Sequence, residues 1–531
     1  MAAIVHELTL LQEREGWLSE AGLRDLAERL GVPLHRLESV STFYPHFRRA
    51  PPRATTLSVC RDLSCALAGG ARVCAGLRRD LAARSDVEVQ EVSCLGRCDL
   101  APAMRVGERA LSGADPAAVI AATERPGPQP PAPSPRRWAA DPYERSEEHY
   151  GTLRRALARA PGELLRTLEA SGLRGMGGAG FPTGRKWSLV AGEASSPRYV
   201  ICNADESEPG SFKDRQILCD LPHLVIEGML LAAHCVGSAR GWIFIRHEYE
   251  PERRRLEAAL DAARAAGALG SDIFGSGFDF DIEIFVSPGG YILGEETALL
   301  ECLENRRGEP RNRPPFPGSR GLWNRPTLIN NVETFAHAVG ILRHGAEWWE
   351  SLGRPDFAGH KFISVSGDVA SPGVVLVPFG TTLGELLERC GGVRDDRALA
   401  AVAPGGASSG FLPPDALDVP IDFATLERAG SMLGSGAAIF VAEGRDLVEA
   451  GLNVTRFFRN ESCGKCVPCR LGTEKAVKLV EGAGGVPEPV EGLLRELHAT
   501  LQQTSICGLG QVALVPLLSI LSNFPEGRER R

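Results

Sequence analysis

Two groups of cysteines have the spacing of metal or cluster ligands, in a chain that holds 14 cysteines. The first group is Cys463, Cys466 and Cys469, a C-x2-C-x2-C run, with Cys507 much later in the chain. Such a run places three thiolates on one tight turn, and a distant fourth thiolate completes the ligand set of a [4Fe–4S] cluster. A zinc site would more often pair two separate C-x2-C units, so zinc is the weaker alternative.

The second group lies near the N-terminus, where Cys60 and Cys65 are spaced C-x4-C and Cys94 and Cys98 are spaced C-x3-C. Four thiolates on two loops, each after a strand-like segment, can enclose a [2Fe–2S] cluster. Structural zinc usually prefers C-x2-C pairs, and disulfides are disfavoured without export signals. The other cysteines sit mostly in apolar patterns and are expected to be ordinary buried residues: Cys74, Cys202, Cys219, Cys235, Cys302 and Cys390.

A glycine-rich run at residues 174–187 has the composition of a phosphate-binding loop. Glycines bring backbone N–H groups close to a bound group, and consecutive N–H groups form a concave nest that holds phosphate. Lys186 follows and can supply a point charge. The run matches neither a Walker A loop nor the G-x-G-x-x-G fingerprint, so by itself it could also be a surface loop without a ligand.

Two acidic motifs strengthen the interpretation of the glycine run. Residues 202–210 follow the apolar residues 199–201, and residues 289–297 lead into a helical pattern. Together with the glycine run they resemble the NADH-binding flavoprotein subunit of respiratory complex I and the diaphorase subunits of NAD-dependent formate dehydrogenases and NAD-linked hydrogenases. The N-terminal cysteine segment resembles the thioredoxin-like [2Fe–2S] ferredoxin that is normally a separate small protein of the assembly, here fused to the flavoprotein.

The resemblance implies that the chain binds FMN and NAD, with no catalytic side chain beyond the groups that position them. It implies a phosphate site at Gly175, Gly177, Gly178 and Ala179, with Lys186 nearby. It implies flavin ring and ribityl contacts from Asn203, Asp205, Glu206, Ser207, Gly294, Glu295, Asn330 and Asn331. It implies that NADH lies over Phe181 and Phe316, near Glu208, Tyr291, Glu295 and Glu296. The carboxylates would suit sugar hydroxyls and repel the extra phosphate of NADPH, although any one of them alone could be a solvated surface charge.

Three residues depart from the pattern of the family. Met176 stands where the glycine loop usually has arginine, and Leu293 stands where cysteine is common. Arg313 stands where lysine is usual, which keeps the charge but changes its geometry. The first change could weaken a cofactor contact, and the second removes a thiol close to the expected flavin.

Hydrophobic and turn patterns predict an α/β multidomain fold. Residues 1–50 form a helical unit, and residues 125–145 form a proline-rich linker that few contacts should cross. By resemblance, residues 51–124 between them form a thioredoxin-like [2Fe–2S] domain. By resemblance, residues 146–358 form a Rossmann-like FMN- and NADH-binding domain. Residues 359–442 form a ubiquitin-like SLBB domain, which we expect to be a spacer without chemistry, and residues 443–531 a helical [4Fe–4S] domain.

Alternating patterns across residues 146–345 predict a mostly parallel sheet covered by helices. Helices are expected at residues 153–168, 222–236 and 251–266, and strands at residues 199–202, 242–245 and 282–286. Each motif should follow a strand, because ligands gather at the carboxyl ends of strands in such sheets.

Composition narrows the class of protein. The 531 residues carry a formal net charge of −8, which argues against nucleic acid as a main partner. No run of eighteen apolar residues and no signal-peptide pattern is visible, so we expect a cytoplasmic protein without direct membrane insertion.

The combined motifs predict an NADH:acceptor oxidoreductase module. Nicotinamide gives up two electrons as hydride whereas a cluster accepts one at a time, and flavin chemistry connects the two. We expect an iron–sulfur or catalytic partner subunit, most consistently that of a soluble NAD-dependent formate dehydrogenase or hydrogenase, because the ferredoxin segment is fused. The alternatives are the flavoprotein subunit of complex I and, more distantly, a zinc-binding interaction scaffold.

Overall fold

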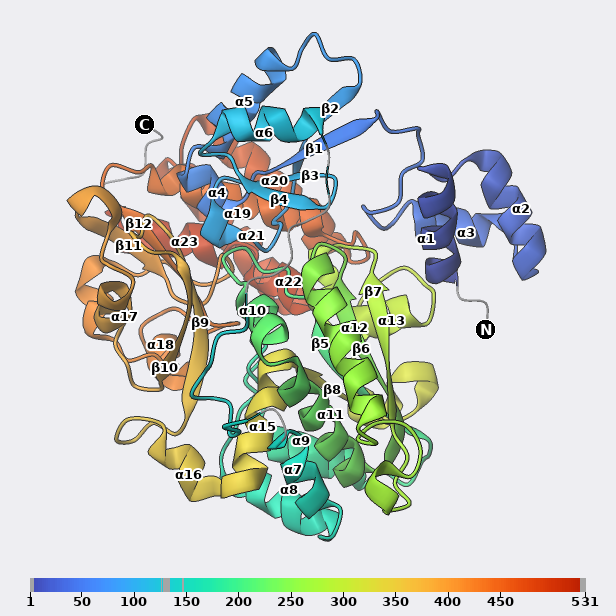
Figure 1. Ribbon diagram of the computed structural model, residues 1–531. Coiled ribbons are helices and arrows are strands. Elements are labelled where there is room, and N and C mark those ends of the chain that lie inside the picture. The colour runs from blue at the N-terminus through green and yellow to red at the C-terminus, as the bar shows by residue number, and fades with distance from the viewer. Residues whose placement is uncertain (1–3, 126, 128–133, 146–147, 526–531) are drawn as a thin grey trace.

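The structure is a computed structural model that describes residues 4–125, 127, 134–145 and 148–525. In Figure 1 the thioredoxin-like unit (blue) lies at the top, the ubiquitin-like unit (orange) at the left and the parallel-sheet unit (green) at the bottom, and the C-terminal helices (red) lie between them. The predicted linker at residues 125–145 lies partly outside the described residues, since residues 126 and 128–133 are not described.

The N-terminal helical unit contains α1 (Ile4–Glu15), α2 (Glu20–Leu30) and α3 (Leu34–Ser41). The N-cap of α2 is Ser19, whose side chain accepts a hydrogen bond from the N–H of Gly22, and its C-cap is Gly31 in the left-handed region. The unit packs on the segment around residues 288–306: Val5 N–H donates to Asn305 Oδ1 at 3.0 Å, and Tyr44 O–H donates to the carbonyl of Arg306.

The thioredoxin-like unit has a four-stranded sheet in the order β2-β1-β3-β4, in which β1 and β2 are parallel and the other pairs antiparallel. Its elements are β1 (Thr55–Cys60), α4 (Leu63–Leu67), α5 (Gly70–Asp80), β2 (Val87–Val92), β3 (Ala103–Val106), β4 (Arg109–Ser112) and α6 (Pro116–Glu124). Both predicted strands are present, and each delivers one cysteine pair to the same end of the sheet.

The parallel-sheet unit has four parallel strands in the order β7-β6-β5-β8. The strands are β5 (Arg198–Ala204), β6 (Ser238–Arg246), β7 (Asp281–Ser287) and β8 (Thr327–Asn331). The helices are α7 (Gly151–Ala156), α8 (Pro161–Ala170), α9 (Thr183–Ala191), α10 (Lys213–Asp220), α11 (Pro222–Val236), α12 (Glu250–Ala265), α13 (Glu296–Leu303), α14 (Pro317–Arg320), α15 (Val332–His344) and α16 (Ala346–Ser351).

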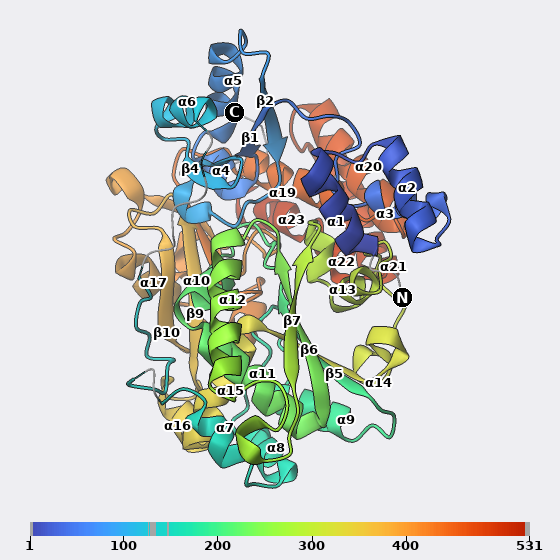
Figure 2. The same ribbon diagram turned by 45° about the vertical axis from the view of Figure 1, so that its right-hand side comes forward.

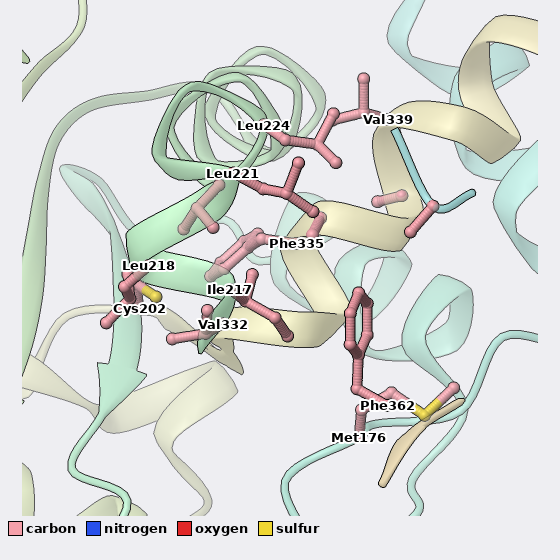
Figure 3. Packing of buried hydrophobic residues seen from close by; sticks show 14 of the residues in the cluster. Met176, Cys202, Ile217, Leu218, Leu221, Leu224, Val332, Phe335, Val339 and Phe362 are labelled. Atoms are coloured by element: carbon pink, nitrogen blue, oxygen red, sulfur yellow. The ribbon is translucent and has the colours of Figure 1, made fainter. Parts of the chain in front are cut away.

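Alternate residues of these strands enter two different cores, because successive side chains of a strand point to opposite faces. Val200 and Ile243 join the core beneath α11 and α15, whereas Ile201 and Phe244 join the core shared with α13. Figure 2 shows α11 and α12 on one side of the sheet and α13 on the other. Helices α11 and α15 approach closely at Gly228, where an added Cβ would lie 2.2 Å from the carbonyl of Phe335. Figure 3 shows the packing of Phe335 and Val332 with Ile217 and Leu221 there.

The ubiquitin-like unit has a mixed sheet in the order β10-β9-β12-β11. Its elements are β9 (His360–Gly367), β10 (Gly373–Pro378), α17 (Leu383–Arg389), β11 (Leu399–Ala403), α18 (Phe423–Arg428) and β12 (Ala437–Ala442). Helix α17 begins with a capping box formed by Thr382 and Glu385. The C-terminal helical unit follows, with α19 (Leu447–Glu461), α20 (Val467–Ala483), α21 (Glu488–Thr504), α22 (Gly508–Val512) and α23 (Val515–Asn523).

No single described helix is both long and apolar enough to cross a membrane, although α10 and α11 satisfy the length and composition criteria as a pair bent by 95°.

Most of the predicted elements are present, with two corrections. The helix predicted at residues 153–168 is two helices, α7 and α8, because Pro161 cannot continue a helix and begins a new one. The expectation that every motif follows a strand is wrong for the glycine run, which connects α8 to α9. The motifs at residues 202–210 and 289–297 do follow β5 and β7.

The expectation that few contacts cross the linker boundary is also wrong. Arg215 of α10 forms a bidentate ion pair with Asp99, at 3.1 and 2.7 Å, and donates to the carbonyl of Gly96 at 2.8 Å. Arg246 donates to the carbonyl of Cys94 at 2.6 Å, and Arg97 pairs with Glu252 at 3.0 Å. The thioredoxin-like unit is therefore docked on the parallel-sheet unit through its cysteine loops.

We predict that Arg215→Met weakens this docking, because it leaves Asp99 and a buried carbonyl without their donor. The loss should be about 3 kcal/mol, as for other nearly buried pairs that lose one partner. Arg78→Met is the matched control, since Arg78 pairs with Glu91 at the exposed surface of the thioredoxin-like unit. An ion pair at such a surface contributes less than about 1 kcal/mol. Calorimetric unfolding midpoints measure both changes, and equal midpoints for the two variants would contradict the prediction.

Candidate functional site

The predicted cofactor residues lie at the carboxyl edge of the parallel sheet, where the strand order reverses. The chain proceeds from β5 outward to β7 and then returns to place β8 on the other side of β5. Ligands of open α/β sheets bind at such a switch point. Asn203 and Asn331 are register partners at the ends of β5 and β8, so both motifs end at this point.

The glycine run forms a loop against this edge. An added Cβ at Gly177 would lie 2.9 Å from Cβ of Asn331, so only glycine can approach the end of β8 this closely. Gly178 has a φ of +126°. Within the described part of the chain, the N–H groups of Gly177, Gly178 and Ala179 have no hydrogen-bond partner. Unpaired N–H groups in a narrow glycine cradle fit an anionic group such as a phosphate.

In the first acidic motif, Glu206 forms hydrogen bonds within the protein, whereas one oxygen of Asp205 has no hydrogen-bond partner. Both oxygens of Glu206 are occupied, by the N–H groups of Asp214 and Arg215 at 3.1 Å and by the hydroxyls of Ser211 and Tyr249. In contrast, Asp205 Oδ2 is buried without a partner, while its Oδ1 accepts from Ser207 at 3.1 Å. Asp205 therefore has a free acceptor for a ligand, and Glu206 holds the loop on α10.

The second acidic motif starts α13. Glu295 Oε2 accepts from the N–H groups of Thr297 and Ala298 at 2.9 and 2.8 Å, while Glu295 Oε1 is buried without a hydrogen-bond partner. Glu296 lies 3.3 Å from Lys186 and 3.4 Å from Arg313. Lys186 also donates to the carbonyl of Ile329 at 2.7 Å. The carbonyl of Gly294 accepts from Asn203 at 2.9 Å, which joins the two acidic motifs.

The two asparagines at the end of β8 have different partners. Asn330 Oδ1 accepts from the indole N–H of Trp187 at 3.1 Å. Asn331 caps α15 through Glu333 N–H, accepts from Lys213 at 3.1 Å and donates to Asp214 at 2.6 Å. The predicted residue Asn331 thus acts first as a support for the site, and direct contact with a cofactor would compete with these bonds.

The predicted stacking residues present open aromatic faces. Phe181 is 43% exposed and Phe316 is 57% exposed, which is unusual for phenylalanine in a packed protein. Tyr291 instead donates to Glu208 at 2.7 Å, and the N–H of Ser408 donates to the other oxygen of Glu208 at 2.7 Å. Glu208 is therefore anchored between two units rather than being a free surface carboxylate.

The departures from the family pattern have structural consequences. Met176 is buried in the core with Phe362 (Figure 3), so its side chain packs rather than contacting a ligand. Leu293 is fully buried, next to the position that a Cβ on Gly308 would take. Arg313 faces both Glu295 and Glu296, at 3.8 and 3.4 Å.

The N-terminal cysteines converge on one buried position. Cys94 Sγ and Cys98 Sγ lie 3.5 Å apart, and contacts with the thiols of Cys65 and Cys94 raise the pKa of Cys60. Backbone N–H groups also face the sulfurs, from Gly96 to Cys94, from Ala103 to Cys65 and from Gly210 to Cys98. Such N–H groups stabilise the negative charge of a thiolate-bound cluster, so the set fits [2Fe–2S].

The C-terminal cysteines form the second set. The thiols of Cys466 and Cys469 interact directly, and Ser462 Oγ lies 3.3 Å from Cys469 Sγ. Cys507 lies near enough to Cys463 for an electrostatic interaction between their sulfurs. Burial raises the pKa of Cys469 to about 11 and that of Cys507 to about 12. Thiols that resist ionisation alone are stabilised as thiolates by bound iron, so the set fits a cluster. The six other cysteines are buried, as predicted.

The two cysteine sets approach a common cavity of about 630 Å³. Cys94 and Cys463 line it together with Ser207 and Tyr291 of the two acidic motifs. Glu461 bridges the units beside it, since it accepts from Ser93 at 2.5 Å and from the N–H of Tyr291 at 2.9 Å.

Sequence reasoning missed several supporting residues. No role was predicted for Lys213, Thr334 or Ser435, yet Lys213 donates to Asn331, Thr334 accepts from Met176 N–H, and Ser435 lies beside Gly178. Lys213 had one available signal, a lysine shortly after the acidic motif. Ser435 had none, because it comes from another unit.

Comparison with known proteins agrees with these sites. Family models match residues 168–339 as a Nuo51 FMN-binding domain, residues 1–125 as a thioredoxin-like [2Fe–2S] ferredoxin, residues 449–531 as the NADH-ubiquinone oxidoreductase-F iron–sulfur binding region, and residues 362–412 as an SLBB domain. The F subunit of NADH-quinone oxidoreductase from Mycobacterium tuberculosis is 42% identical over 401 residues, which is 74% of this chain and 90% of that protein. The chain belongs to this flavoprotein family.

Other relatives extend the likeness. The corresponding NADH-quinone oxidoreductase protein of Escherichia coli is 42% identical over 72% of this chain and 87% of its own length. The HndC subunit of the NADP-reducing hydrogenase of Solidesulfovibrio fructosivorans is 40% identical over 72% of this chain and 78% of its own. A chain in the crystal structure of an NAD⁺-reducing [NiFe]-hydrogenase in the H2-reduced state superposes with a TM-score of 0.86 and 32% identity, over 98% of this chain and 92% of that chain.

The predicted cofactor set is thereby confirmed: this flavoprotein is an NADH dehydrogenase-type oxidoreductase with FMN, NAD, a [2Fe–2S] cluster and a [4Fe–4S] cluster. Both cysteine sets fall inside iron–sulfur family models, which favours clusters over the zinc alternative.

We predict that Cys94→Ala removes the binuclear EPR signal of the reduced protein, because one thiolate of a four-thiolate site is lost. The [4Fe–4S] signal, the bound FMN and most NADH–ferricyanide activity should remain. Cys466→Ala should have the converse effect on the two signals. Cys74→Ala is the control, since Cys74 is buried in the same unit outside the cysteine set. Loss of both signals in either single variant, or of neither in Cys94→Ala, would contradict the assignment.

We also predict a pH-dependent cost of burying Asp205 in the flavin-free protein. Burial raises the pKa of Asp205 from 3.8 to about 7. The folded state then holds a proton that the unfolded chain has lost between these values. The free energy of unfolding therefore falls as pH rises through this window, by at most about 4 kcal/mol.

Flavin-free Asp205→Asn should accordingly lose less stability than the wild type between pH 5 and 8. Denaturant unfolding at both pH values, each with the same cluster content, measures the difference. Parallel pH profiles for the two proteins would show that Asp205 titrates normally.

Proposed function

We propose that this chain is the NAD(H)-side module of a soluble, cytoplasmic NAD-dependent hydrogenase or formate dehydrogenase. It would exchange hydride equivalents between NAD(H) and FMN and pass single electrons through its clusters to or from a catalytic partner subunit. The observation that carries the proposal is the docked N-terminal unit, which occurs in one chain with the flavoprotein. The hydrogenase chain superposes over 98% of this chain, including the N-terminal unit, whereas the sequence matches to the NADH-quinone oxidoreductase relatives and to HndC cover 72–74%.

The second candidate is the flavoprotein subunit of a complex I assembly. It is supported by sequence identity, which is 42% with the Escherichia coli NADH-quinone oxidoreductase protein and 40% with the HndC hydrogenase subunit, each over 72% of this chain. The two candidates share the same site chemistry and differ in the partner that accepts the electrons.

Our assignment of roles follows the free groups of the site. The N–H groups of Gly177, Gly178 and Ala179 would hold the FMN phosphate, and the free oxygens of Asp205 and Glu295 would accept hydrogen bonds from the flavin or the nucleotide. Bound FMN supplies the chemistry that links a two-electron hydride donor to one-electron acceptors. Phe181 and Phe316 would stack on the nucleotide and keep water from the reacting faces.

We also propose the division of the chain into domains, with a linker at residues 125–145 and domain ends at residues 358 and 442.

Preference for NAD over NADP is part of the proposal. The carboxylates of Glu295 and Glu296, at the start of α13, would repel a ribose phosphate. Arg313 and Lys186 partly neutralise that charge, at 3.4 and 3.3 Å from Glu296. Since the HndC relative is named as a subunit of an NADP-reducing hydrogenase, the ratio of kcat/KM for the two nucleotides is the readout that tests this preference.

The test is activity of the purified chain with reconstituted flavin and clusters. We expect one FMN per chain, oxidation of NADH with ferricyanide, and a kcat/KM for NADH at least about tenfold above that for NADPH. A preparation that retains no flavin and oxidises no NADH would overturn the proposal. Native purification from the source then separates the candidates: hydrogen- or formate-dependent NAD⁺ reduction supports the first, and NADH:quinone activity in the co-purifying complex supports the second.

A further inference from the structure

A buried ammonium from the ubiquitin-like unit lies directly behind the glycine loop. Lys361, at the start of β9, has no solvent exposure. Its Nζ atom donates to Glu333 Oε2 at 2.5 Å, to the carbonyl of Ser435 at 3.1 Å and to the carbonyl of Met176 at 3.4 Å. One side chain thus joins the ubiquitin-like unit, α15 and the glycine loop.

The charge of Lys361 is part of a closed network. Glu333 also lies 3.0 Å from Lys213, and Lys213 lies 2.6 Å from Asp214, so two ammoniums face two carboxylates. Burial lowers the pKa of Lys361 to about 8. Against the same burial, the ammoniums of Lys361 and Lys213 hold the pKa of Glu333 well below its ordinary value. The ammonium of Lys361 is therefore held in place by a paired carboxylate rather than exposed to solvent.

The contact of Lys361 with the loop acts on one peptide group. In a trans peptide the carbonyl and the following N–H point in opposite directions. The Met176 carbonyl accepts from Lys361, so the N–H of the following Gly177 points away from Lys361. The other side of the same residue is fixed as well, because the N–H of Met176 donates to Thr334 at 2.9 Å.

Two further contacts hold the loop against the ubiquitin-like unit. The side chain of Met176 is buried in a cluster with Phe362, the residue after Lys361 (Figure 3). Gly178 packs against the Gly434–Ser435 peptide, with 3.8 Å from its added Cβ to the carbonyl carbon of Gly434. The hydroxyl of Ser435 is buried there without a partner.

We propose that Lys361 is a positioning residue of the flavin phosphate site: it fixes the Met176–Gly177 peptide so that the N–H of Gly177 faces the phosphate. This proposal rests on the proposed function, in which the glycine loop binds that phosphate. A cation on the carbonyl also polarises the peptide and strengthens its N–H as a donor. The ubiquitin-like unit, which the sequence suggested to be a spacer, then forms the rear wall of the cofactor site.

The experiment compares FMN with riboflavin, which has the same ring and ribityl chain without the phosphate. Flavin-free full-length protein with both clusters intact is titrated with each flavin. The dissociation constant of riboflavin divided by that of FMN is the ratio that measures recognition of the phosphate. Lys361→Met should lower this ratio about tenfold to a hundredfold, the range for losing one well-placed hydrogen bond to a charged group. A general destabilisation of the protein would weaken the binding of both flavins equally and leave the ratio unchanged.

Asp368→Asn is the matched control. Asp368 is a buried carboxylate of the same unit that pairs with Arg445 and does not contact the glycine loop. It should leave the ratio at the wild-type value even where it lowers the melting temperature. If Asp368→Asn lowers the ratio as much as Lys361→Met, the effect belongs to the whole unit and the proposal is wrong.

A second variant covers the case in which Lys361→Met does not fold, since it leaves Glu333 buried with one cation fewer. Lys361→Met combined with Glu333→Gln removes one charge of each sign and still lacks the bond to Met176. It should show the same low ratio, and a wild-type ratio would overturn the proposal. The two levels of inference separate as well: a wild-type protein that binds both flavins equally would refute the phosphate loop itself. If the wild type prefers FMN to riboflavin and Lys361→Met keeps the same preference, only the role of Lys361 is refuted.

Discussion

The pairing of buried charges across unit boundaries is the constraint on which this structure depends. Glu333 has no solvent exposure and lies between Lys361 of the ubiquitin-like unit and Lys213 of α10. A buried carboxylate that lost either cation would cost several kcal/mol, so each unit is stable in this form only with the others in place. The units thus form one body because their interfaces contain charges that cannot be exposed singly at low cost.

The same constraint fixes the distances between cofactor sites. Arg215 binds Asp99 and the carbonyl of Gly96, and Arg246 binds the carbonyl of Cys94 while its other nitrogen binds the carbonyl of Glu206. A cluster loop and an acidic cofactor motif therefore share one guanidinium. Electron transfer between sites needs such fixed separations, and side-chain contacts supply them here where a proline-rich linker could not.

How far the sequence predicts this arrangement depends on how local the signal is. The cysteine sets, β5, β6 and β7, and helices α11 and α12 were predicted, because spacing and hydrophobic period are local properties. The docking of the thioredoxin-like unit was not, since Arg215 and Asp99 are 116 residues apart and nothing in either neighbourhood signals the other. The place of the glycine loop was missed for the same reason: α9 and Asn331 bring it to the sheet, not a preceding strand.

The motif residues themselves divide into those that build the site and those left free for a ligand. Glu206 and Asn331 use their polar atoms within the protein, whereas Asp205 and Glu295 each keep one buried oxygen without a hydrogen bond. Motif spacing cannot separate the two roles, because both require the same residue types at the same positions. The division has a physical consequence. Since Glu206 and Asn331 already hold their loops on α10 and α15, little backbone entropy remains to be lost when a cofactor binds, and the free oxygens are presented in a fixed geometry.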